Sequence, residues 1–540
     1  MALPAAYIGW RSSRSCHLRG AFLCGAAGSA AAAGELSSKR PASGYGAAVM
    51  KKKLKAAYVI GYEDDDHVIY RNGEVVYEGD TILYAGKQYP GTVDEELDMG
   101  LAIISPGFID LDALVDIDHG ILDVAVPRTA ADRYRRNPDT FRKSELFSRE
   151  ELRTKHRLSY AQLIMNGITT GMPIAGDGFR AWAETYEEMA DGAEIAAELG
   201  MRMYLGPSYR MSPSPHAPVD SDRGPASVRD AFRYVEDFDG SFDGLIRAFL
   251  SPCQLPNLTE DVVRETKAFS DSKGVPIRLH CAESPQEAAY LLERYGLSPI
   301  EYLAHLEFLG ARTLIPHAIL TGPMLSSGKP KRDELALLVH SATSVVHTPI
   351  AEAHGGQALY SFSHYLAAGV NMTMGTDTHP ADMIQNLNFA WNLTRIIERG
   401  ELFNPYGGPI EAATRKTTEA DLFRAATTNG AKALGRDDLG KLAPGAKADI
   451  IVVELDSLRV TPIEDPIRTL IMNTTGANVR DVMINGRTVM RNFALPDLDT
   501  EELREKAQQC FNKYKACYTV TDQERRSGDV LFPPAFPIID

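Results

Sequence analysis

Short apolar runs alternate along most of this chain with longer segments in which apolar residues recur at helical spacing. Eight of these runs predict β-strands, at residues 102–109, 167–173, 202–207, 245–250, 276–281, 313–319, 344–348 and 371–375. The segments between them, such as residues 182–199 and 285–295, have the apolar spacing of amphipathic helices. Eight successive strand and helix units favour an α/β fold, a TIM (β/α)8 barrel, over an open sheet.

The two flanks of this region have a different pattern, with strand-like runs separated by turns. Residues 57–60, 68–70, 75–77 and 81–84 predict a β-meander, with turns at residues 64–66 and 71–73. Residues 448–453 and 479–484 have the same character, and Asn485-Gly486 predicts a hairpin turn. We therefore expect the chain ends to pair in a composite β-sandwich beside the barrel.

The first 49 residues differ from the rest, because they are rich in Ala, Ser and Gly and have no hydrophobic period. Their excess of basic residues is typical of an organelle transit peptide, and a disordered extension or a true start at Met50 are the alternatives. The chain thus divides into residues 1–49 (extension), 50–104 (N-terminal part of the sandwich), 105–435 (barrel), 436–495 (C-terminal part of the sandwich) and 496–540 (C-terminal helix and tail).

Composition narrows the range of partners. The net charge of -15 argues against nucleic acid or an anionic membrane surface and favours a small-molecule substrate. The six cysteines contain no Cys-x-x-Cys pair, which favours a reducing compartment and a cytoplasmic protein, with organelle import by residues 1–49 as the alternative. No apolar run approaches the roughly 20 residues that span a bilayer. We also expect the protein to form a homo-oligomer, most simply a dimer.

Ionisable residues stand at the ends of several predicted strands, where a barrel places its active site. Imidazole and carboxylate groups that converge there are the usual ligands of Zn²⁺, which lowers the pKa of bound water to about 7. A single histidine on an apolar strand is more often a packed core residue, but several at one end favour a site. The candidates are His280, Glu283, His317, Asp377 and Asp112, with His347 and His379 as residues that support the pocket wall or join the site.

Several motifs together resemble the amidohydrolase superfamily, in the branch of guanine deaminase-like and triazine chlorohydrolase-like enzymes. They are Pro106-Gly107-Phe108-Ile109-Asp110, Asn166-Gly167-Ile168-Thr169-Thr170, His280-x-x-Glu283, His317, Gly375-Thr376-Asp377, Ala425–Gly435 and Gly440–Asp449. The resemblance implies a barrel with a composite β-sandwich, and water attack on a C–N or similar bond at a metal ion. It implies that His280 and Asp377 bind the metal, that Glu283 shuttles the proton and that His317 polarises the substrate.

The first strand departs from the family pattern. Family members carry His-x-His where this chain has Asp112-Ala113-Leu114. We therefore expect Asp112, His119 or Asp118 to complete the metal site. For each of the three, the alternative is a structural role such as capping or loop hydrogen bonding. The predicted strand at residues 245–250 lacks the bridging lysine of binuclear members, which favours one divalent ion. Zn²⁺ is expected, with Mn²⁺, Co²⁺ and Fe²⁺ as alternatives for a site richer in oxygen.

Two hypotheses follow. The first is a metal-dependent hydrolase that attacks the C–N bond of a small amide, urea, carbamate or amino-heterocycle, with Glu283 as proton shuttle and His317 and Asp377 as further catalytic residues. The alternative is a non-catalytic amidohydrolase-like scaffold that has lost its metal. Metal analysis separates the two, because a scaffold binds well under one ion per chain.

Overall fold

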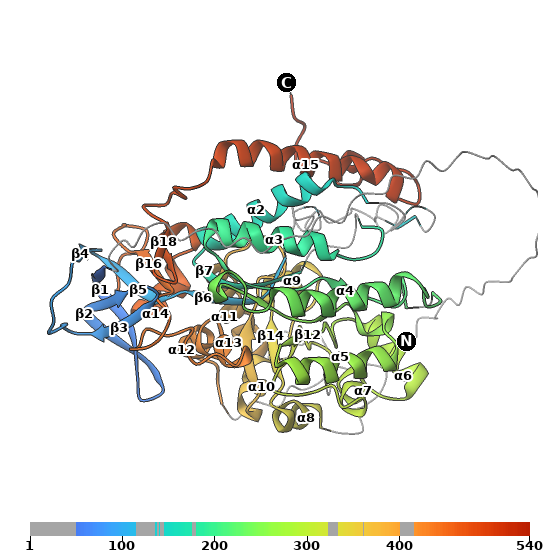
Figure 1. Ribbon diagram of the computed structural model, residues 1–540, viewed down its shortest axis with the longest axis horizontal. Coiled ribbons are helices and arrows are strands. Elements are labelled where there is room, and N and C mark those ends of the chain that lie inside the picture. The colour runs from blue at the N-terminus through green and yellow to red at the C-terminus, as the bar shows by residue number, and fades with distance from the viewer. Residues whose placement is uncertain are drawn as a thin grey trace, which may run out of the picture. The chain divides into compact units, whose positions relative to one another are not determined.

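The computed structural model describes residues 50–114, 122, 135–137, 140, 145–174, 180–215, 217–321, 333–359, 361–399 and 415–539. Strands from both ends of this part share one eight-stranded sheet, which we call the end sheet (Figure 1). Its strands are β1 (Lys51–Glu63), β2 (Asp66–Glu78), β3 (Thr81–Gly86), β4 (Glu95–Asp98), β5 (Ala102–Pro106), β16 (Ile450–Glu454), β17 (Val479–Ile484) and β18 (Arg487–Met490). The strand β16 pairs antiparallel with β5, so segments more than 300 residues apart close one hydrophobic core.

The predicted turn at residues 71–73 is wrong, because β2 runs through it without a break. The chain reverses instead at Asp64 and Asp65, which adopt φ values of 48° and 62° between β1 and β2. Within β2, Asn72 adopts the left-handed conformation, with φ of 51°, which asparagine tolerates better than most residues. The residues of a turn motif are therefore used here as a kink within a long strand.

A second set of strands forms two parallel four-stranded sheets. The first has the order β10-β8-β7-β6 and the second β12-β13-β14-β15. The strands are β6 (Phe108–Leu114), β7 (Ile168–Ile174), β8 (Arg202–Leu205), β10 (Ile246–Ala248), β12 (Ile277–Arg278), β13 (Thr313–Pro316), β14 (Ser344–His347) and β15 (Asn371–Met374). Parallel bridges from Ala113 to Asp377 and from Leu250 to Ile277 join the two sheets at both edges. The predicted α/β class is confirmed, and the eight strands occur in the predicted order.

The single strand predicted at residues 102–109 is wrong, because the chain changes sheets at Gly107. β5 belongs to the end sheet, and β6 begins at Phe108, whose N–H donates to the carbonyl of Gly167 (3.0 Å). A Cβ atom on Gly107 would lie 2.1 Å from Thr169 Oγ1, so only glycine allows the crossing. The apolar run is continuous in sequence, and this is why its pattern did not reveal the break.

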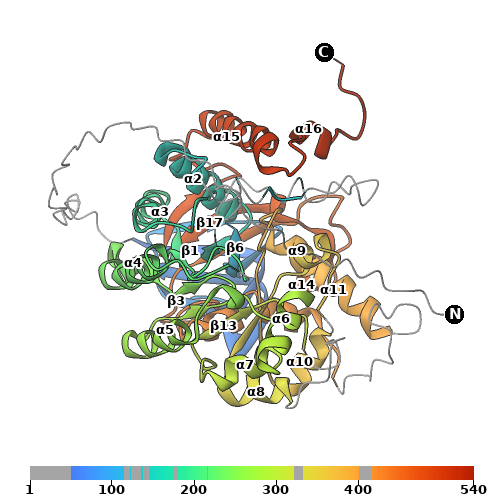
Figure 2. The same ribbon diagram turned by 90° about the vertical axis from the view of Figure 1, so that its right-hand side faces the viewer.

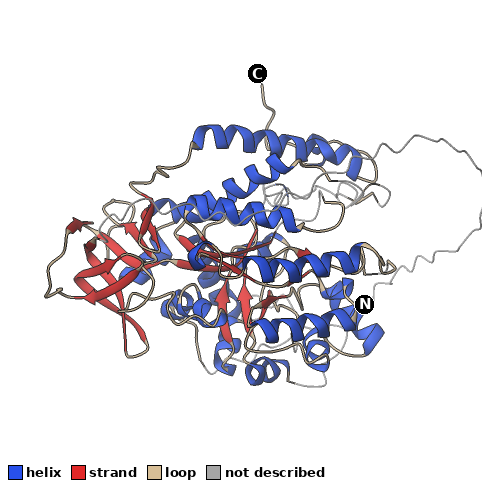
Figure 3. Ribbon diagram, in the orientation of Figure 1, coloured by secondary structure: helices blue, strands red, loops and turns tan. Residues whose placement is uncertain are grey.

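Helices lie outside the parallel strands (Figures 2 and 3). They are α2 (Arg149–Met165), α3 (Tyr186–Leu199), α4 (Arg223–Phe238), α5 (Glu260–Lys273), α6 (Pro285–Tyr295), α7 (Pro299–His305), α8 (Glu334–Ser341), α9 (Pro349–His354), α10 (Phe362–Ala368), α11 (Met383–Arg399), α12 (Glu419–Ala425), α13 (Thr428–Ala433), α14 (Pro466–Asn473), α15 (Thr500–Thr521) and α16 (Gly528–Leu531). Local signals fix α6, which follows the His-x-x-Glu motif: Ser284 caps its first turn and Gly296 ends it at φ of 68°. Among the described residues, no helix is long and apolar enough to cross a membrane.

Candidate functional site

Four of the predicted site residues meet where β6, β12, β13 and β15 end. Asp112, His280 and His317 each offer a ligand atom, and these atoms lie within 4.8 Å of one another, as a metal site requires. His280 Nε2 lies 3.4 Å from Asp112 Oδ2, and His317 Nε2 lies 4.0 Å from Asp377 Oδ2. The strand ends therefore bring two imidazoles and the Asp112 carboxylate together, with the Asp377 carboxylate beside His317.

The backbone at these strand ends is strained. Ala282, His317, Ala318 and Asp377 have φ values of 56°, 66°, 47° and 56°, although none is glycine. This left-handed conformation costs roughly 1–2 kcal/mol per residue, and such residues gather at active sites, where the surrounding fold imposes them. The strain turns His317 and Asp377 towards the site and marks this region as one that the fold does not optimise for stability alone.

The Gly375-Thr376-Asp377 motif positions β15 against β6. The N–H of Asp377 donates to the carbonyl of Asp112 (2.5 Å), and Thr376 Oγ1 donates to Asp110 Oδ2 (2.6 Å). A Cβ atom on Gly375 would lie 2.9 Å from Asp112 Cβ, too close for any other residue. Glycine at this position thus lets the two acidic residues approach each other.

Opposite charges in the site shift one another's pKa. Burial alone would raise the pKa of Asp112, but His280 and Arg278 hold it at about 2. Burial and the neighbouring Asp112 raise the pKa of Asp377 to about 7. Burial would lower the pKa of His317, but Glu283, Asp377 and Asp112 raise it to about 9. Acidic and basic groups therefore interact strongly here, and three carboxylates favour positive charge at the position of His317.

The donor set fits a divalent metal ion. Both carboxylate oxygens of Asp112 are buried and make no hydrogen bond of good geometry to any described residue. Its Oδ2 faces His280 Nε2, the other donor of the candidate group, whereas its Oδ1 faces Arg278. His317 Nδ1 lies 2.9 Å from Thr348 Oγ1, and this contact directs Nε2 towards Asp377. Nitrogen and oxygen donors in this number and spacing suit Zn²⁺.

Three residues that sequence reasoning missed support this cluster. Thr348 orients His317, and Glu352 accepts a hydrogen bond from the N–H of Thr348 (3.3 Å). Arg278 Nη1 lies 3.1 Å from Asp112 Oδ1. One signal was available for Arg278: it is a lone cation on an apolar strand, two residues before His280 and so on the same face.

The remaining candidates lie elsewhere. His347 is buried, and its Nδ1 lies 3.2 Å from Glu352 Oε1; it is not in the metal-ligand group. His379 is exposed and is also absent from that group. Asp118 and His119 lie outside the described residues.

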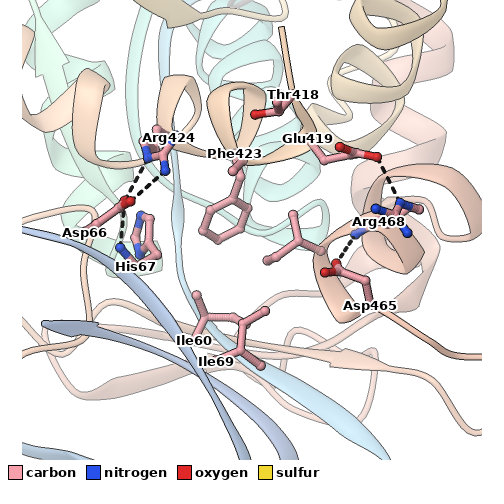
Figure 4. A pocket seen from close by; sticks show the side chains of 12 residues that line it. Ile60, Asp66, His67, Ile69, Thr418, Glu419, Phe423, Arg424, Asp465 and Arg468 are labelled. Carbon is pink, nitrogen blue, oxygen red and sulfur yellow. Dashed lines mark hydrogen bonds and ion pairs between the residues drawn. The ribbon is translucent and has the colours of Figure 1, made fainter.

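Two cavities differ in their relation to this cluster. One, with a volume of about 140 Å³, is lined by His280 and Glu283 together with Leu255 and Tyr290. The larger, about 180 Å³, lies between β1 and β2 of the end sheet and helices α12 and α14 (Figure 4). We call this the sheet–helix cavity; it contains none of the candidate residues. The smaller cavity is therefore the candidate substrate pocket.

The profile of the Amidohydrolase family matches residues 103–489, which is more than half of the chain. The chain belongs to this family. The match confirms the resemblance seen in the sequence and the predicted class of enzyme, an amidohydrolase-type hydrolase.

Curated relatives with similar sequences are named as deaminases. The chain is 24% identical over 461 residues to the 5'-deoxyadenosine deaminase of Methanosarcina acetivorans, covering 84% of this chain and 96% of the relative. It is 26% identical over 457 residues to the 5-methylthioadenosine/S-adenosylhomocysteine deaminase of Halobacterium salinarum, covering 83% and 93%. Both of these relatives match over nearly their whole length.

Solved structures share the fold. An adenosine deaminase from Xanthomonas campestris with bound zinc superposes with a TM-score of 0.69 at 20% identity, covering 86% of this chain and 98% of that one. The atrazine chlorohydrolase of Arthrobacter aurescens, in complex with zinc, superposes with a TM-score of 0.69 at 19% identity, covering 85% and 99%. Both of these structures hold zinc.

Proposed function

We propose that this protein is a zinc-dependent hydrolase that removes an amino group from a small amino-substituted heterocycle. The observation that carries the proposal is the convergence of His280, His317, Asp112 and Asp377 beside the pocket that contains Glu283. The names of the curated relatives support an aminopurine-like substrate among the C–N substrates expected from the sequence. We also propose that the two joined parallel sheets form a TIM (β/α)8 barrel and that the end sheet is part of a composite β-sandwich built from both chain ends.

In this proposal His280, Asp112 and Asp377 hold one divalent ion. The ion, when bound, polarises water and lowers its pKa. The Glu283 carboxylate lines the pocket next to His280, so it takes a proton from the attacking water and delivers it to the leaving nitrogen. Water adds to the ring carbon, the C–N bond breaks, and ammonia leaves.

His317 has a separate task. Its Nδ1 is fixed by Thr348, so its Nε2 is the atom that faces the reacting group. In this role a protonated Nε2 donates to a substrate atom that gains negative charge. Glu287 Oε2 accepts the N–H of Glu283 (3.0 Å) and so fixes the turn that presents the shuttle.

A screen for ammonia release tests the proposal. Zinc-loaded protein is incubated with adenosine, 5'-deoxyadenosine, 5'-methylthioadenosine and an aminotriazine, with His280→Ala as control. We expect release from at least one substrate and none with the variant. The proposal is wrong if zinc is bound at about one ion per chain and no substrate of this class is deaminated.

One observation favours the alternative of a scaffold without metal: the buried ion pair between Arg278 and Asp112 occupies one side of a candidate ligand. Retention of two histidines and two further acids beside it favours the enzyme, because burying them without a use is costly. The predicted dimer and cytoplasmic location remain part of the proposal.

A further inference from the structure

Arg278 is a fixed positive charge at the floor of the candidate metal site. Its side chain is fully buried, and its guanidinium lies 4.9 Å from the ring centre of Phe249. Its other contacts are with backbone carbonyls: Nη2 donates to Pro173 (2.9 Å), and Nη1 donates to Leu111 (3.2 Å) and to Met172. These contacts tie β12 to β6 and β7 and leave the guanidinium little freedom to move away.

The Asp112 carboxylate is shared between this cation and the metal-ligand group. Its Oδ1 faces Arg278 Nη1 at 3.1 Å, and its Oδ2 faces His280 Nε2 at 3.4 Å. An ion bound between Asp112 and His280 therefore adds a second positive charge on the far side of one carboxylate. Because the interior screens charge weakly, the two cations repel each other strongly.

We propose that Arg278 is a built-in counter-charge that lowers the affinity of this site for its divalent ion, so that the ion exchanges more readily than a site without the arginine would allow. The inference rests on the proposed function and deepens it, because it concerns the metal of the same site. Arg278 touches neither substrate nor the reacting atoms in this account and is a positioning residue. Arg278 compensates part of the negative charge that Asp112 would otherwise offer to the ion.

Zinc affinity of the full-length protein tests the inference. Metal is stripped by a chelator, and Zn²⁺ binding is measured by competition with a chromophoric chelator for wild type, Arg278→Gln and Arg278→Lys. Glutamine removes the charge but keeps a donor for the carbonyls, whereas lysine keeps the charge. We expect Arg278→Gln to bind Zn²⁺ at least tenfold more tightly than wild type, about 1.4 kcal/mol, and Arg278→Lys to stay within about threefold.

Circular dichroism and thermal melting of the metal-free variants check that each one folds. Where Arg278→Gln does not fold, the same comparison is made between Asp112→Asn and the double variant Asp112→Asn/Arg278→Gln. The double variant removes both members of the buried ion pair, so neither charge is left without its partner. We again expect the form without arginine to bind at least tenfold more tightly.

Each further outcome has a defined meaning. Equal or weaker zinc binding by a folded form without arginine overturns the inference and assigns Arg278 a structural role. If wild type and variants all bind no zinc, the proposed function fails as well, so the two failures are distinguishable. Affinity that rises equally with glutamine and lysine also contradicts the inference, because it would not depend on charge.

Discussion

Two groups of charged side chains in this protein differ in how completely they are paired. In the sheet–helix cavity, Asp66 accepts two hydrogen bonds from Arg424 (2.7 and 2.6 Å), and Arg468 donates to Glu419 (2.9 Å), as Figure 4 shows. In the candidate site, Asp112 lies 3.1 Å from Arg278 Nη1 and 3.4 Å from His280 Nε2, but neither of its oxygens accepts a hydrogen bond of good geometry from a described residue. Charges that are fully hydrogen-bonded fasten elements together, whereas an ion-paired carboxylate without well-directed hydrogen bonds can still accept a ligand.

Cavity size does not identify the candidate site, because the larger cavity is the one that contains the fully paired charges. The sheet–helix cavity is the larger of the two, but its lining includes the apolar residues Ile60, Ile69 and Phe423, and its charged residues bond one another. The smaller pocket has His280 and Glu283 in its wall. Volume alone therefore does not locate function in this fold; the state of the polar groups does.

The sharpest test of this contrast is Glu283→Gln. Loss of the proton shuttle should lower kcat about 10³-fold, because general acid–base catalysis typically contributes 10²–10⁴-fold. The melting temperature should stay near the wild-type value. Steady-state ammonia release measures the effect, and Glu293→Gln, an exposed residue of the neighbouring helix α6, is the matched control. Activity within about threefold of wild type would remove Glu283 from the mechanism.

The next largest effect is expected from Gly375→Ala. The added Cβ would lie 2.9 Å from Asp112 Cβ and 3.1 Å from its carbonyl, so β6 and β15 must separate. We expect the free energy of unfolding to fall by about 2 kcal/mol and zinc affinity to fall at least tenfold. Gly355→Ala is the control, because its Cβ would come no closer than 3.3 Å to a neighbouring atom, Glu352 O, and its φ is −73°. Equal effects of the two substitutions would contradict the role of Gly375.

His67 tests the sheet–helix cavity through pH. Burial lowers its pKa from 6.5 to about 4, against the opposing effect of Asp66. The unfolded chain therefore binds more protons than the folded one between these two values, and stability is lost as pH falls from 6.5 to 4. Between pH 7 and 4.5, wild type should lose on the order of 2 kcal/mol more than His67→Gln in urea denaturation. Parallel pH profiles would show that His67 is not buried as a neutral ring.

A smaller effect is expected from Arg424→Met, which breaks the bidentate pair with Asp66. Because the pair is partly exposed, the free energy of unfolding should fall by only about 1 kcal/mol, with kcat and zinc affinity unchanged. Arg468→Met is the comparison and should change stability less, because Arg468 is more exposed than Arg424. A loss of activity in either variant would break the distinction between the two groups of charges.

Local pattern predicted much of this arrangement. Apolar spacing predicted the parallel strands and the helices between them. Positions at strand ends pointed to His280 and His317, which lie in one group with Asp112, and to Asp377, which lies beside His317. The change of sheet at Gly107 could not be predicted, because pairing partners are non-local and the apolar run is unbroken. The partner of Asp112 was missed for a similar reason: Arg278 is 166 residues away and meets it only across the ring of strands.

Zinc stoichiometry tests the central claim most directly. Wild type and the variant His280→Asn are dialysed against excess Zn²⁺ and then against metal-free buffer with a weak chelator, and bound zinc is measured by mass spectrometry. We expect about one ion per chain for wild type and far less for the variant, because imidazole and carboxylate donors must act together. Less than about 0.2 ion per wild-type chain would contradict a metal-dependent hydrolase and favour the scaffold.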